Sequence, residues 1–499
     1  MGAFGSREYM TKISHFAADA RRAMEENGFE PDFSSSIMDQ LNELVSADPR
    51  DPSTSEVRDL RATTWSSIDN TTSRDLDQVE WAEKLPNGDI RVLVGIADVD
   101  AFVEKDSPID RRARQNTVTI YTEGHIFPML PEELSTNLTS LNEGEDRLAV
   151  VADMTVKISG DVPESTFYRA WVRNHVKLSY EDVAEFLDSG RTSAEISRYP
   201  WVAEQIRLQD GAAVRLHKYR IKKGALEFES IESKVVLDGG EIAGLVSQEP
   251  SRARKLIENF MVAANVEMAE FLEGNGWASL RRVVRLPDRW EGIRRIAGEH
   301  GFSLPDEPDR AALADFLEER RTADPERFPD LSLSIVKLIG SGEYVVERMG
   351  EDAGGHFGLA VEDYAHSTAP NRRFTDLIIQ RLVKSLLAGQ EPPYSNEELD
   401  AIALHANDRE RAARKVERKM RKVIAATVMK QHVGESFDAI VTGVTPSGTF
   451  ARILRPPVDG RIERGERGLD VGEKVRVKLV SADPRRGFID FEAIHGASV

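Results

Sequence analysis

The sequence predicts a multidomain protein of mixed α and β structure, α+β or α/β in class. It should have a helical N-terminal region, a large central domain and a small C-terminal β-barrel. A length of 499 residues exceeds what one ordinary hydrophobic core accommodates, so several domains are expected. Strand-like runs dominate the first part of the centre and helical runs its second part. The tail consists of alternating apolar runs separated by glycines, which is typical of a small barrel.

Residues 1–55 are expected to be mostly helical. Two sets of apolar residues recur at helical spacing: Ile13, Phe16 and Ala20, then Ile37, Leu41 and Leu44. The following stretch, residues 47–55, is rich in Pro, Asp and Ser and reads as a linker. Two short helices fit either a simple helical appendage or a winged-helix-type domain.

Residues 56–390 are expected to form the large α/β domain. Strands are expected over residues 89–98, 118–121 and 148–154, and helices over residues 256–272 and 375–387. Residues 391–433 then read as one or two connecting helices. On these, Arg411, Lys415, Arg418 and Lys422 recur at steps of three and four, so they share one helix face. Such a face either contacts a phosphate backbone, chiefly through Arg418 and Lys422, or is merely solvated.

Residues 434–499 resemble the five-stranded OB barrel of the ribosomal-protein type, which is an RNA-binding module. Four of its strands are expected over residues 437–445, 447–453, 471–480 and 487–491. Phe437, Phe450 and Phe488 are candidates for stacking on bases, and at least one of them is expected in the core.

An acidic segment, residues 67–78, carries the most informative chemistry. Asp69, Asp75 and Asp77 are interleaved with Asn, Ser and Thr, which suit a tight loop bonded to its own backbone. Concentrated carboxylates without nearby His or Cys favour Mg²⁺ or Mn²⁺ over zinc. The alternative is a solvated acidic turn.

A second group of motifs lies far along the chain and supports the first interpretation. It comprises residues 356–360 (HFGLA) and residues 364–376 (YAHSTAPNRRFTD), with further matches at residues 96–99, 127–131 and 256–261. Together with the acidic segment, these motifs resemble the catalytic domain of the ribonuclease II (RNB) family of hydrolytic 3′→5′ exoribonucleases. The resemblance covers about residues 57 to 390 in consistent order.

The resemblance implies roles for individual residues. Asp69, Asp75 and Asp77 would be catalytic residues that bind Mg²⁺, and Arg372 would brace the charge that develops on the scissile phosphate. Arg373 would contact a neighbouring phosphate, and Tyr121 would stack near the terminal base.

Each of these implied roles has a structural alternative. The two arginines could instead form salt bridges, for example with Asp376, and Tyr121 could simply pack. Glu258 either reaches the RNA channel or lies on a helix surface. His366 is expected to be structural or a neighbour of the substrate.

Both motifs depart from the family pattern. The late motif, residues 364–376, keeps its arginines but has Ala369 for Ser, Asn371 for Ile and Phe374 for Tyr. The departure in the acidic loop matters more. The family's acidic loop ends in a fourth Asp, counted among its metal ligands, and here Gln78 occupies that position. A neutral ligand should weaken Mg²⁺ binding by about one to two orders of magnitude. Three explanations are open: Asp69, Asp75, Asp77 and Gln78 suffice, Asp98 or Asp100 supplies the charge, or the chain binds RNA without cutting it well.

Composition excludes several classes of protein. The chain has no Cys, which excludes disulfides and thiol catalysis, and it has no apolar run long enough to span a membrane. A net charge of −19 argues against the chain as a whole being a nucleic-acid glue. We expect a cytoplasmic monomer that acts on single-stranded RNA 3′ ends. By resemblance, residues 1–55 leave no room for two cold-shock-like barrels, so weaker RNA clamping and distributive action are expected.

Two functions of different class therefore compete. The first is a Mg²⁺-dependent exoribonuclease that releases nucleoside 5′-monophosphates. The second is a catalytically weak RNA-binding protein on the same fold.

Overall fold

A curled β-sheet forms the centre of the molecule. The computed structural model describes residues 5–46, 57–122, 125–229, 232–238, 241–248, 251–325, 327–446 and 448–494, so the expected linker 47–55 lies outside the described residues. The six strands are β1 (Arg58–Asp59), β2 (Trp65–Asp69), β3 (Gln78–Lys84), β4 (Ile90–Ala97), β7 (Asp146–Val156) and β8 (Ser165–Ser179). Their order is β1-β8-β2-β3-β4-β7, and β7 also pairs with β8. Hydrogen bonding therefore runs in a circuit that returns to β8.

Helices cover this sheet and complete its core. They are α3 (Pro108–Asn116), α4 (Tyr180–Ser189), α5 (Ala194–Arg198), α6 (Val202–Lys222), α7 (Arg252–Gly274) and α11 (Phe374–Leu387). Strand β4 is buried on both faces, which explains its nearly continuous apolar run. Single turns of other helix types occupy Val99–Ala101 and Leu134–Leu138. The mixed α/β fold class is thus confirmed.

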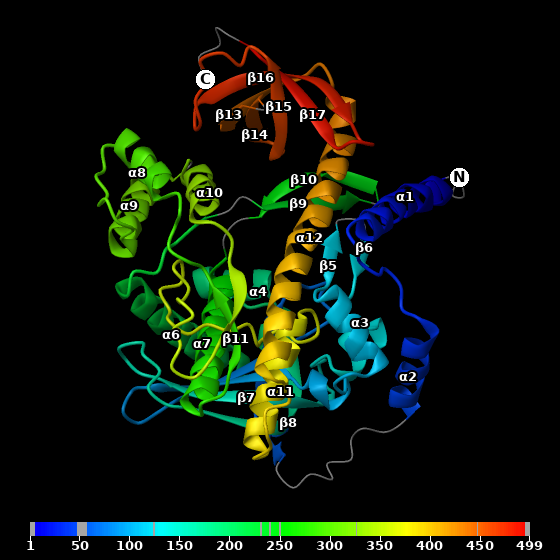
Figure 1. The fold of residues 1–499 in the computed structure, drawn as a ribbon, viewed down its shortest axis with the longest axis vertical. Coiled ribbons are helices and arrows are strands. Elements are labelled where there is room, and N and C mark those ends of the chain that lie inside the picture. Colours follow the sequence, from blue (N-terminus) through cyan, green and yellow to red (C-terminus); the bar gives the residue numbers. More distant parts are fainter. Residues whose placement is uncertain are drawn as a thin grey trace.

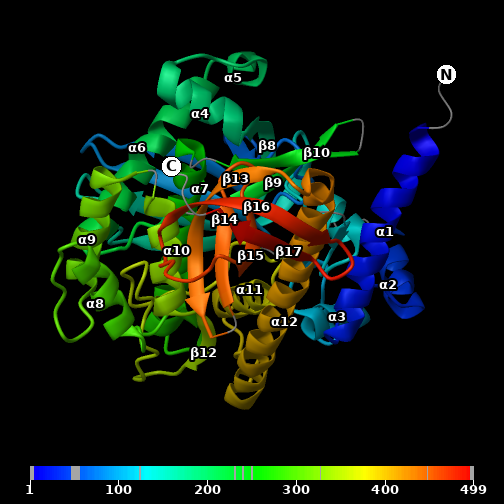
Figure 2. The same ribbon diagram turned by 90° about the horizontal axis from the view of Figure 1, so that it is seen from above.

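Smaller units surround this core. Three strand pairs are β5 (Ile120–Thr122) with β6 (His125–Phe127), β9 (Glu232–Asp238) with β10 (Glu241–Gln248), and β11 (Ser279–Val283) with β12 (Glu343–Glu347). Helices α8 (Trp290–Glu299), α9 (Arg310–Ala323) and α10 (Phe328–Ile339) share a separate apolar cluster around Phe316 and Phe328. They lie on the side of the molecule opposite the N-terminal helices (Figures 1 and 2).

The longest helix, α12 (Asn396–Met429), joins the parts of the chain. Ser395 and Glu398 form a capping box at its start, and its 34 residues span about 51 Å. It runs from the central sheet and its helices up to the barrel and passes α1 (Figure 1). The predicted connecting segment is therefore a single helix followed by a short 3₁₀ turn, Lys430–His432.

The N-terminal residues form α1 (Gly5–Glu26) and α2 (Ser35–Ser46) and contain no strand among residues 5–46. The two helices pack on different partners, because α1 contacts α12 and α2 contacts α3. Arg409 on α12 donates to the carbonyls of Asn27 and Gly28, at 3.0 and 2.9 Å, and so anchors the end of α1.

The C-terminal barrel is closed, in the order β13-β14-β15-β17-β16. Its strands are β13 (Ser436–Thr445), β14 (Gly448–Ile453), β15 (Val458–Arg464), β16 (Lys474–Asp483) and β17 (Phe488–Ala493). The five-stranded prediction is confirmed, although β15 was not foreseen. Ala426 and Met429 at the end of α12 belong to the barrel core. Of the three Phe candidates, Phe437 packs partly against that core, whereas Phe488 is exposed.

No helix in the described part of the chain combines the length and the apolarity needed to cross a membrane.

Glu267 on α7 should make the fold less stable at neutral pH than at mildly acidic pH. Its side chain is buried, and burial raises its pKa to about 7. Because the folded pKa lies above the unfolded value of about 4.3, stability falls as pH rises between those values, by about 2–3 kcal/mol. Glu267→Gln should flatten this slope in urea unfolding measured from pH 5 to pH 8. Glu258→Gln, at an exposed position of α7, is the control, and equal slopes in all three proteins would contradict the assignment.

Candidate active site

The acidic loop connects β2 to β3, with Asp69 ending the first strand and Gln78 beginning the second. Oδ1 of Asp69 accepts hydrogen bonds from the Asn70 N–H at 2.6 Å and from the Ser73 hydroxyl at 2.9 Å. The loop is thus bonded locally, as predicted, but the Ser73 side chain bonds to the Asp69 carboxylate and not to the backbone. Strand β3, which sequence reasoning missed, stands between the loop and the expected strand β4.

Neighbouring elements hold the loop from two sides. Nζ of Lys177 on β8 donates to the carbonyls of Thr71 and Ser73, at 3.2 and 2.5 Å. The Ser140 hydroxyl accepts from the Leu76 N–H at 2.9 Å and donates to the Arg74 carbonyl at 2.8 Å. The carboxylates are therefore presented by a braced backbone, as a preorganised site requires.

The late motif, residues 364–376, meets this loop at Asp77. Oδ1 of Asp77 accepts from the Asn371 N–H at 3.2 Å, and Oδ2 accepts from Nε of Arg372 at 3.1 Å. The two residues of the ion pair are 295 positions apart in the chain. The Asp77 side chain is 2% exposed, whereas the Arg372 side chain is 46% exposed. A buried carboxylate therefore holds a guanidinium that is partly accessible to solvent. The folded chain thus joins the two motifs into one site.

Arg373 has a different position from Arg372. Its Nε and Nη2 both donate to Asp376, at 2.9 and 2.7 Å, and the same carboxylate accepts from the Ala369 N–H at 2.8 Å. The salt bridge with Asp376 that was considered for either arginine forms on Arg373. This pair shapes the turn that precedes α11 and presents Arg372, while the phosphate contact of Arg373 stays a prediction.

The substitutions in the late motif are accommodated around that turn. Asn371 is buried, and its Oδ1 accepts from the Thr139 hydroxyl at 2.5 Å. Phe374 is buried in the main core. His366 is buried beside Tyr344, whose hydroxyl lies 2.8 Å from its Nδ1, and burial holds the pKa of His366 well below its usual range. This contact accounts for the expected structural role.

The carboxylates of the acidic loop lie close enough to repel one another. Burial raises the pKa of Asp77 to about 7, although Arg372 opposes the shift and Asp75 adds to it. Burial also raises the pKa of Asp75, and the nearby Asp69 adds to that shift. Arg372 is paired with Asp77 and so offsets part of this negative charge. An excess of buried or half-buried oxygen ligands is the donor set that fits a hard divalent cation.

Gln78 lies at the start of β3, and its side chain is buried. The idea that Asp98 or Asp100 supplies the missing charge is wrong, because both are already neutralised. Asp98 binds Arg169 at 2.9 Å and Lys384 at 2.7 Å. Asp100 binds Arg381 and Lys384, each at 2.7 Å. These pairs connect the sheet to α11 instead.

Sequence reasoning missed another acidic residue, Glu80 on β3. It is fully buried, and neither of its carboxylate oxygens has a hydrogen-bond partner among the described residues. Burial holds its pKa well above the ordinary value, and Asp69 adds to the shift. Glu80 could have been found from the sequence, because side chains alternate along a strand and Gln78 and Glu80 therefore lie on the same face.

Tyr121 on β5 borders the acidic loop. Its hydroxyl donates to Oδ2 of Asp75 at 3.4 Å, and its backbone N–H donates to Glu417 on α12 at 3.3 Å. Tyr121 is 42% exposed, so it does not belong to the buried core. Its stacking on a base stays a prediction.

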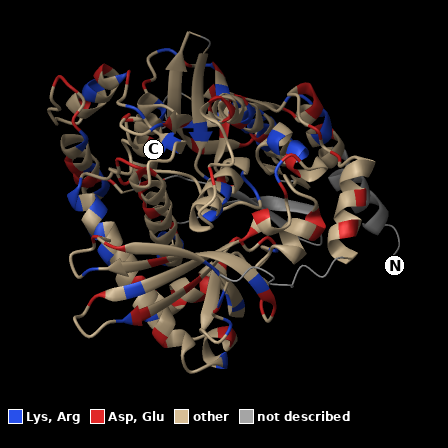
Figure 3. Ribbon diagram, turned by 60° about the horizontal axis from the view of Figure 1, so that its bottom comes forward, with Lys and Arg blue, Asp and Glu red and all other residues tan. Residues whose placement is uncertain are grey.

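The remaining candidates lie away from this arrangement. Glu258 is exposed on α7, and Arg418 and Lys422 are exposed on α12. Relative to Glu417, which contacts Tyr121, helix geometry rotates Arg418 by about 100° and Lys422 by about 140°. Arg414 and Arg421 lie closer to the Glu417 direction, at about 60° and 40°. The predicted basic stripe therefore faces away from Tyr121. Acidic and basic residues are interspersed over most elements (Figure 3).

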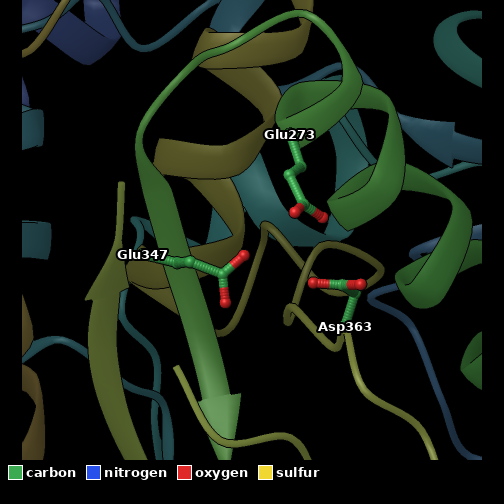
Figure 4. A group of neighbouring side chains, drawn as sticks. All are labelled: Glu273, Glu347 and Asp363. Atoms are coloured by element: carbon green, nitrogen blue, oxygen red, sulfur yellow. The ribbon is translucent and has the colours of Figure 1, made fainter. Parts of the chain in front are cut away.

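A second acidic group lies between α7, β12 and the segment that follows β12. The carboxylates of Glu273, Glu347 and Asp363 point toward one another, with ligand atoms within 4.8 Å (Figure 4). Nη2 of the buried Arg281 lies 3.1–3.8 Å from all three and offsets their charge. The oxygens of Asp69, Asp75 and Asp77 do not all come within 4.8 Å of one another.

This second group borders a pocket of about 390 Å³. Six carboxylates line the pocket, from Glu273, Glu347, Glu351, Asp352, Glu362 and Asp363. A surface of this charge repels a phosphate backbone, so the pocket does not fit RNA. Three distant chain segments build the group, and no sequence motif marks it.

Comparison with known proteins adds the family context. The model described as "RNB domain" matches residues 57–389, and the one described as "RNase II-type exonuclease C-terminal S1 domain" matches residues 435–494. Ribonuclease R of Vibrio cholerae is 32% identical over 479 residues, which cover 87% of this chain and 57% of that protein. Ribonuclease R of Escherichia coli K12 is 30% identical, with the same coverages. The chain thus spans less than two thirds of the length of these relatives.

Solved structures share the fold. Mycoplasma genitalium RNase R, in complex with ribose-methylated single-stranded RNA, matches with a TM-score of 0.87 and 23% identity. The match covers 96% of this chain and 78% of that one. Yeast Ssd1, described as a pseudonuclease, matches with a TM-score of 0.65 and 17% identity, over 81% of this chain and 50% of its own. Because the fold occurs in both, the side chains of the site must decide the function.

Proposed function

Since this chain belongs to the RNB family, we propose that it is a hydrolytic 3′→5′ exoribonuclease that requires a divalent metal ion, Mg²⁺ or Mn²⁺. Its substrate would be a single-stranded RNA 3′ end and its products nucleoside 5′-monophosphates. The observation that carries this proposal is the Asp77–Arg372 pair, in which a buried carboxylate directs an exposed guanidinium beside Asp69 and Asp75.

The residues present account for the steps of such a reaction. A divalent cation among Asp69, Asp75 and Asp77 would neutralise the phosphate and favour attack by water. Water attacks the phosphorus of the last phosphodiester, and the 3′ oxygen of the preceding nucleotide leaves and takes a proton. Arg372 uses Nε to bind Asp77, and no described residue accepts a hydrogen bond from its two Nη groups. Those groups are therefore available to the phosphoryl oxygens. Two parallel N–H donors of one guanidinium stabilise the negative charge that develops on the phosphoryl group.

Binding along the RNA would use aromatic surfaces that ignore base identity. Tyr121 is open to solvent beside Asp75, and Phe488 is 55% exposed on the barrel. Stacking on such rings is sequence-tolerant, as an exonuclease that removes every nucleotide requires. The barrel packs on the end of α12 and so has a defined position relative to the site.

The second candidate is an RNA-binding protein that cuts weakly or not at all. Gln78 favours it, because this neutral residue replaces a carboxylate implied by the family pattern. The retained Asp77–Arg372 pair favours the enzyme instead, because it leaves a guanidinium open to an anionic substrate.

The experiment that decides between them uses a 5′-labelled single-stranded RNA of thirty nucleotides with Mg²⁺, Mn²⁺ or EDTA. We expect products that shorten from the 3′ end, mononucleotides released as 5′-monophosphates, and complete inhibition by EDTA. RNA that stays intact with every metal while it shifts in a gel would refute the nuclease and support the binding protein.

Gln78→Asp is expected to change metal dependence in the same assay. An added carboxylate at the start of β3 should lower the Mg²⁺ concentration needed for half-maximal rate by about 10-fold or more. Gln431→Asp, at an exposed position within the 3₁₀ turn that follows α12, should leave that concentration unchanged. An unchanged or higher Mg²⁺ requirement in Gln78→Asp would show that this position does not face the cation.

A further inference from the structure

Glu80 presents an unexplained group beside the acidic loop. Its side chain is fully buried, yet neither oxygen of its carboxyl group has a hydrogen-bond partner among the described residues. Burying a polar group without a partner costs several kcal/mol, and an ionised carboxylate costs more. An apolar side chain would fill the same volume at lower cost, so a partner that the protein itself does not provide is indicated.

The geometry of β3 relates Glu80 to Gln78. The residues are two positions apart on one strand, so their side chains leave the same face. The Cα atom of Glu80 pairs with that of Ser66 on β2, the strand that ends at Asp69. Asp69 in turn pairs with Ser179, directly before Tyr180. Burial raises the pKa of Tyr180, and the charges of Asp69 and Glu80 both add to that shift.

The nearby cations do not neutralise Glu80. Arg372 binds Asp77, while Arg254 lies over the Tyr180 ring and donates to Oδ1 of Asn70 at 2.8 Å. The side-chain amide of Gln205 on α6 makes two hydrogen bonds with the backbone of Ala82, at 2.8 and 2.9 Å. No described residue donates a hydrogen bond to the Glu80 carboxyl group, which lies on the strand that follows the acidic loop.

We propose that Glu80 is the fourth carboxylate of the metal site and supplies the negative charge that Gln78 lacks. This inference rests on the divalent metal site of the proposed function and deepens it. The acidic set facing the cation is then Asp69, Asp75, Asp77 and Glu80. In this chain the fourth carboxylate stands at position 80 of β3, the next position on the same face as position 78.

The test measures Mn²⁺ binding to RNA-free protein, by the loss of the free Mn²⁺ signal in electron paramagnetic resonance. Glu80→Gln keeps the size of the side chain and removes the charge, and Glu80→Met replaces it by an apolar chain. Both should weaken Mn²⁺ binding about 10- to 100-fold. Glu83→Gln, at an exposed position of the same strand, should bind like the wild type.

Thermal unfolding in EDTA separates a metal role from a structural one. If Glu80 faces a cation, the neutral variants unfold at the wild-type temperature or above it, and Mn²⁺ stabilises them less. If Glu80 is only structural, they unfold at a lower temperature and bind Mn²⁺ like the wild type, which overturns the proposal. Adding Gln78→Asp to Glu80→Gln should restore affinity to within about 3-fold of the wild type. Failure to restore it overturns the claim that the two positions supply the same charge.

The outcomes for the two proposals are distinct. Wild-type protein that leaves RNA intact, with Mn²⁺ binding still dependent on Glu80, refutes the nuclease and supports this inference. RNA degradation by a wild type whose Mn²⁺ affinity does not depend on Glu80 refutes only this inference.

Discussion

Asp77→Asn is expected to reduce RNA degradation at least 100-fold, about the effect of removing one preorganised charge at a reacting centre. Asp77 bonds both to Arg372 and to the backbone of Asn371. The neutral amide removes a carboxylate from the metal site and cannot retain Arg372 as an ion pair. Single-turnover degradation of a 5′-labelled RNA measures the loss.

The stability of Asp77→Asn shows whether that loss is specific to the site. The pKa of Asp77 is raised to about 7 in the fold, above its unfolded value of about 3.9. Its ionisation therefore destabilises the metal-free protein as pH rises between those values. Asp77→Asn removes this effect and should be at least as stable as the wild type at pH 8. Asp188→Asn, at an exposed carboxylate, is the matched control. Wild-type rates in Asp77→Asn would contradict the assigned role.

Arg372→Lys is expected to lower kcat by about 100- to 1000-fold, the range found when one donor to a developing charge is removed. The guanidinium can bind Asp77 through Nε and still offer two Nη groups, whereas one ammonium cannot occupy both places. Since positive charge is retained, KM should change far less than kcat. Steady-state kinetics on a short RNA separate the two constants.

Arg373→Lys is the matched comparison for the neighbouring residue. Arg373 makes two hydrogen bonds to Asp376. Its replacement should therefore lower the unfolding temperature and reduce kcat less than Arg372→Lys does. Equal losses of kcat in both variants, or a loss below 3-fold in Arg372→Lys, would contradict the distinction between the two arginines.

Several elements of the secondary structure could be predicted from local pattern. The apolar spacing of α7 and α11 and the continuous apolar run of β4 carry strong signals, and these elements lie where they were expected. β3 and β15 were missed because each carries several charged residues along a short strand. In both, pairing with neighbouring strands decides the structure, and local propensity does not.

Some features of the site could likewise be predicted from the sequence, and others could not. Asp69, Asp75, Asp77 and Arg372 stand in motifs that could be recognised without a structure. The unlike positions of Arg372 and Arg373 could not, since adjacent residues at a turn differ only in the partner that each finds. The neutralised state of Asp98 depends on Lys384, 286 positions away.

The sequence by itself determined the family, the order of the domains and the residue types that can bind a metal ion and a phosphate, because these depend on motifs and on periodicity. The tertiary structure decided which charges are paired and which are left over. It buried Asp77 against Arg372, it neutralised Asp98 and Asp100, and it enclosed Glu80 without a partner. The physical reason is that the energy of a charge depends on burial and on its neighbours in space, which residues distant in the chain provide.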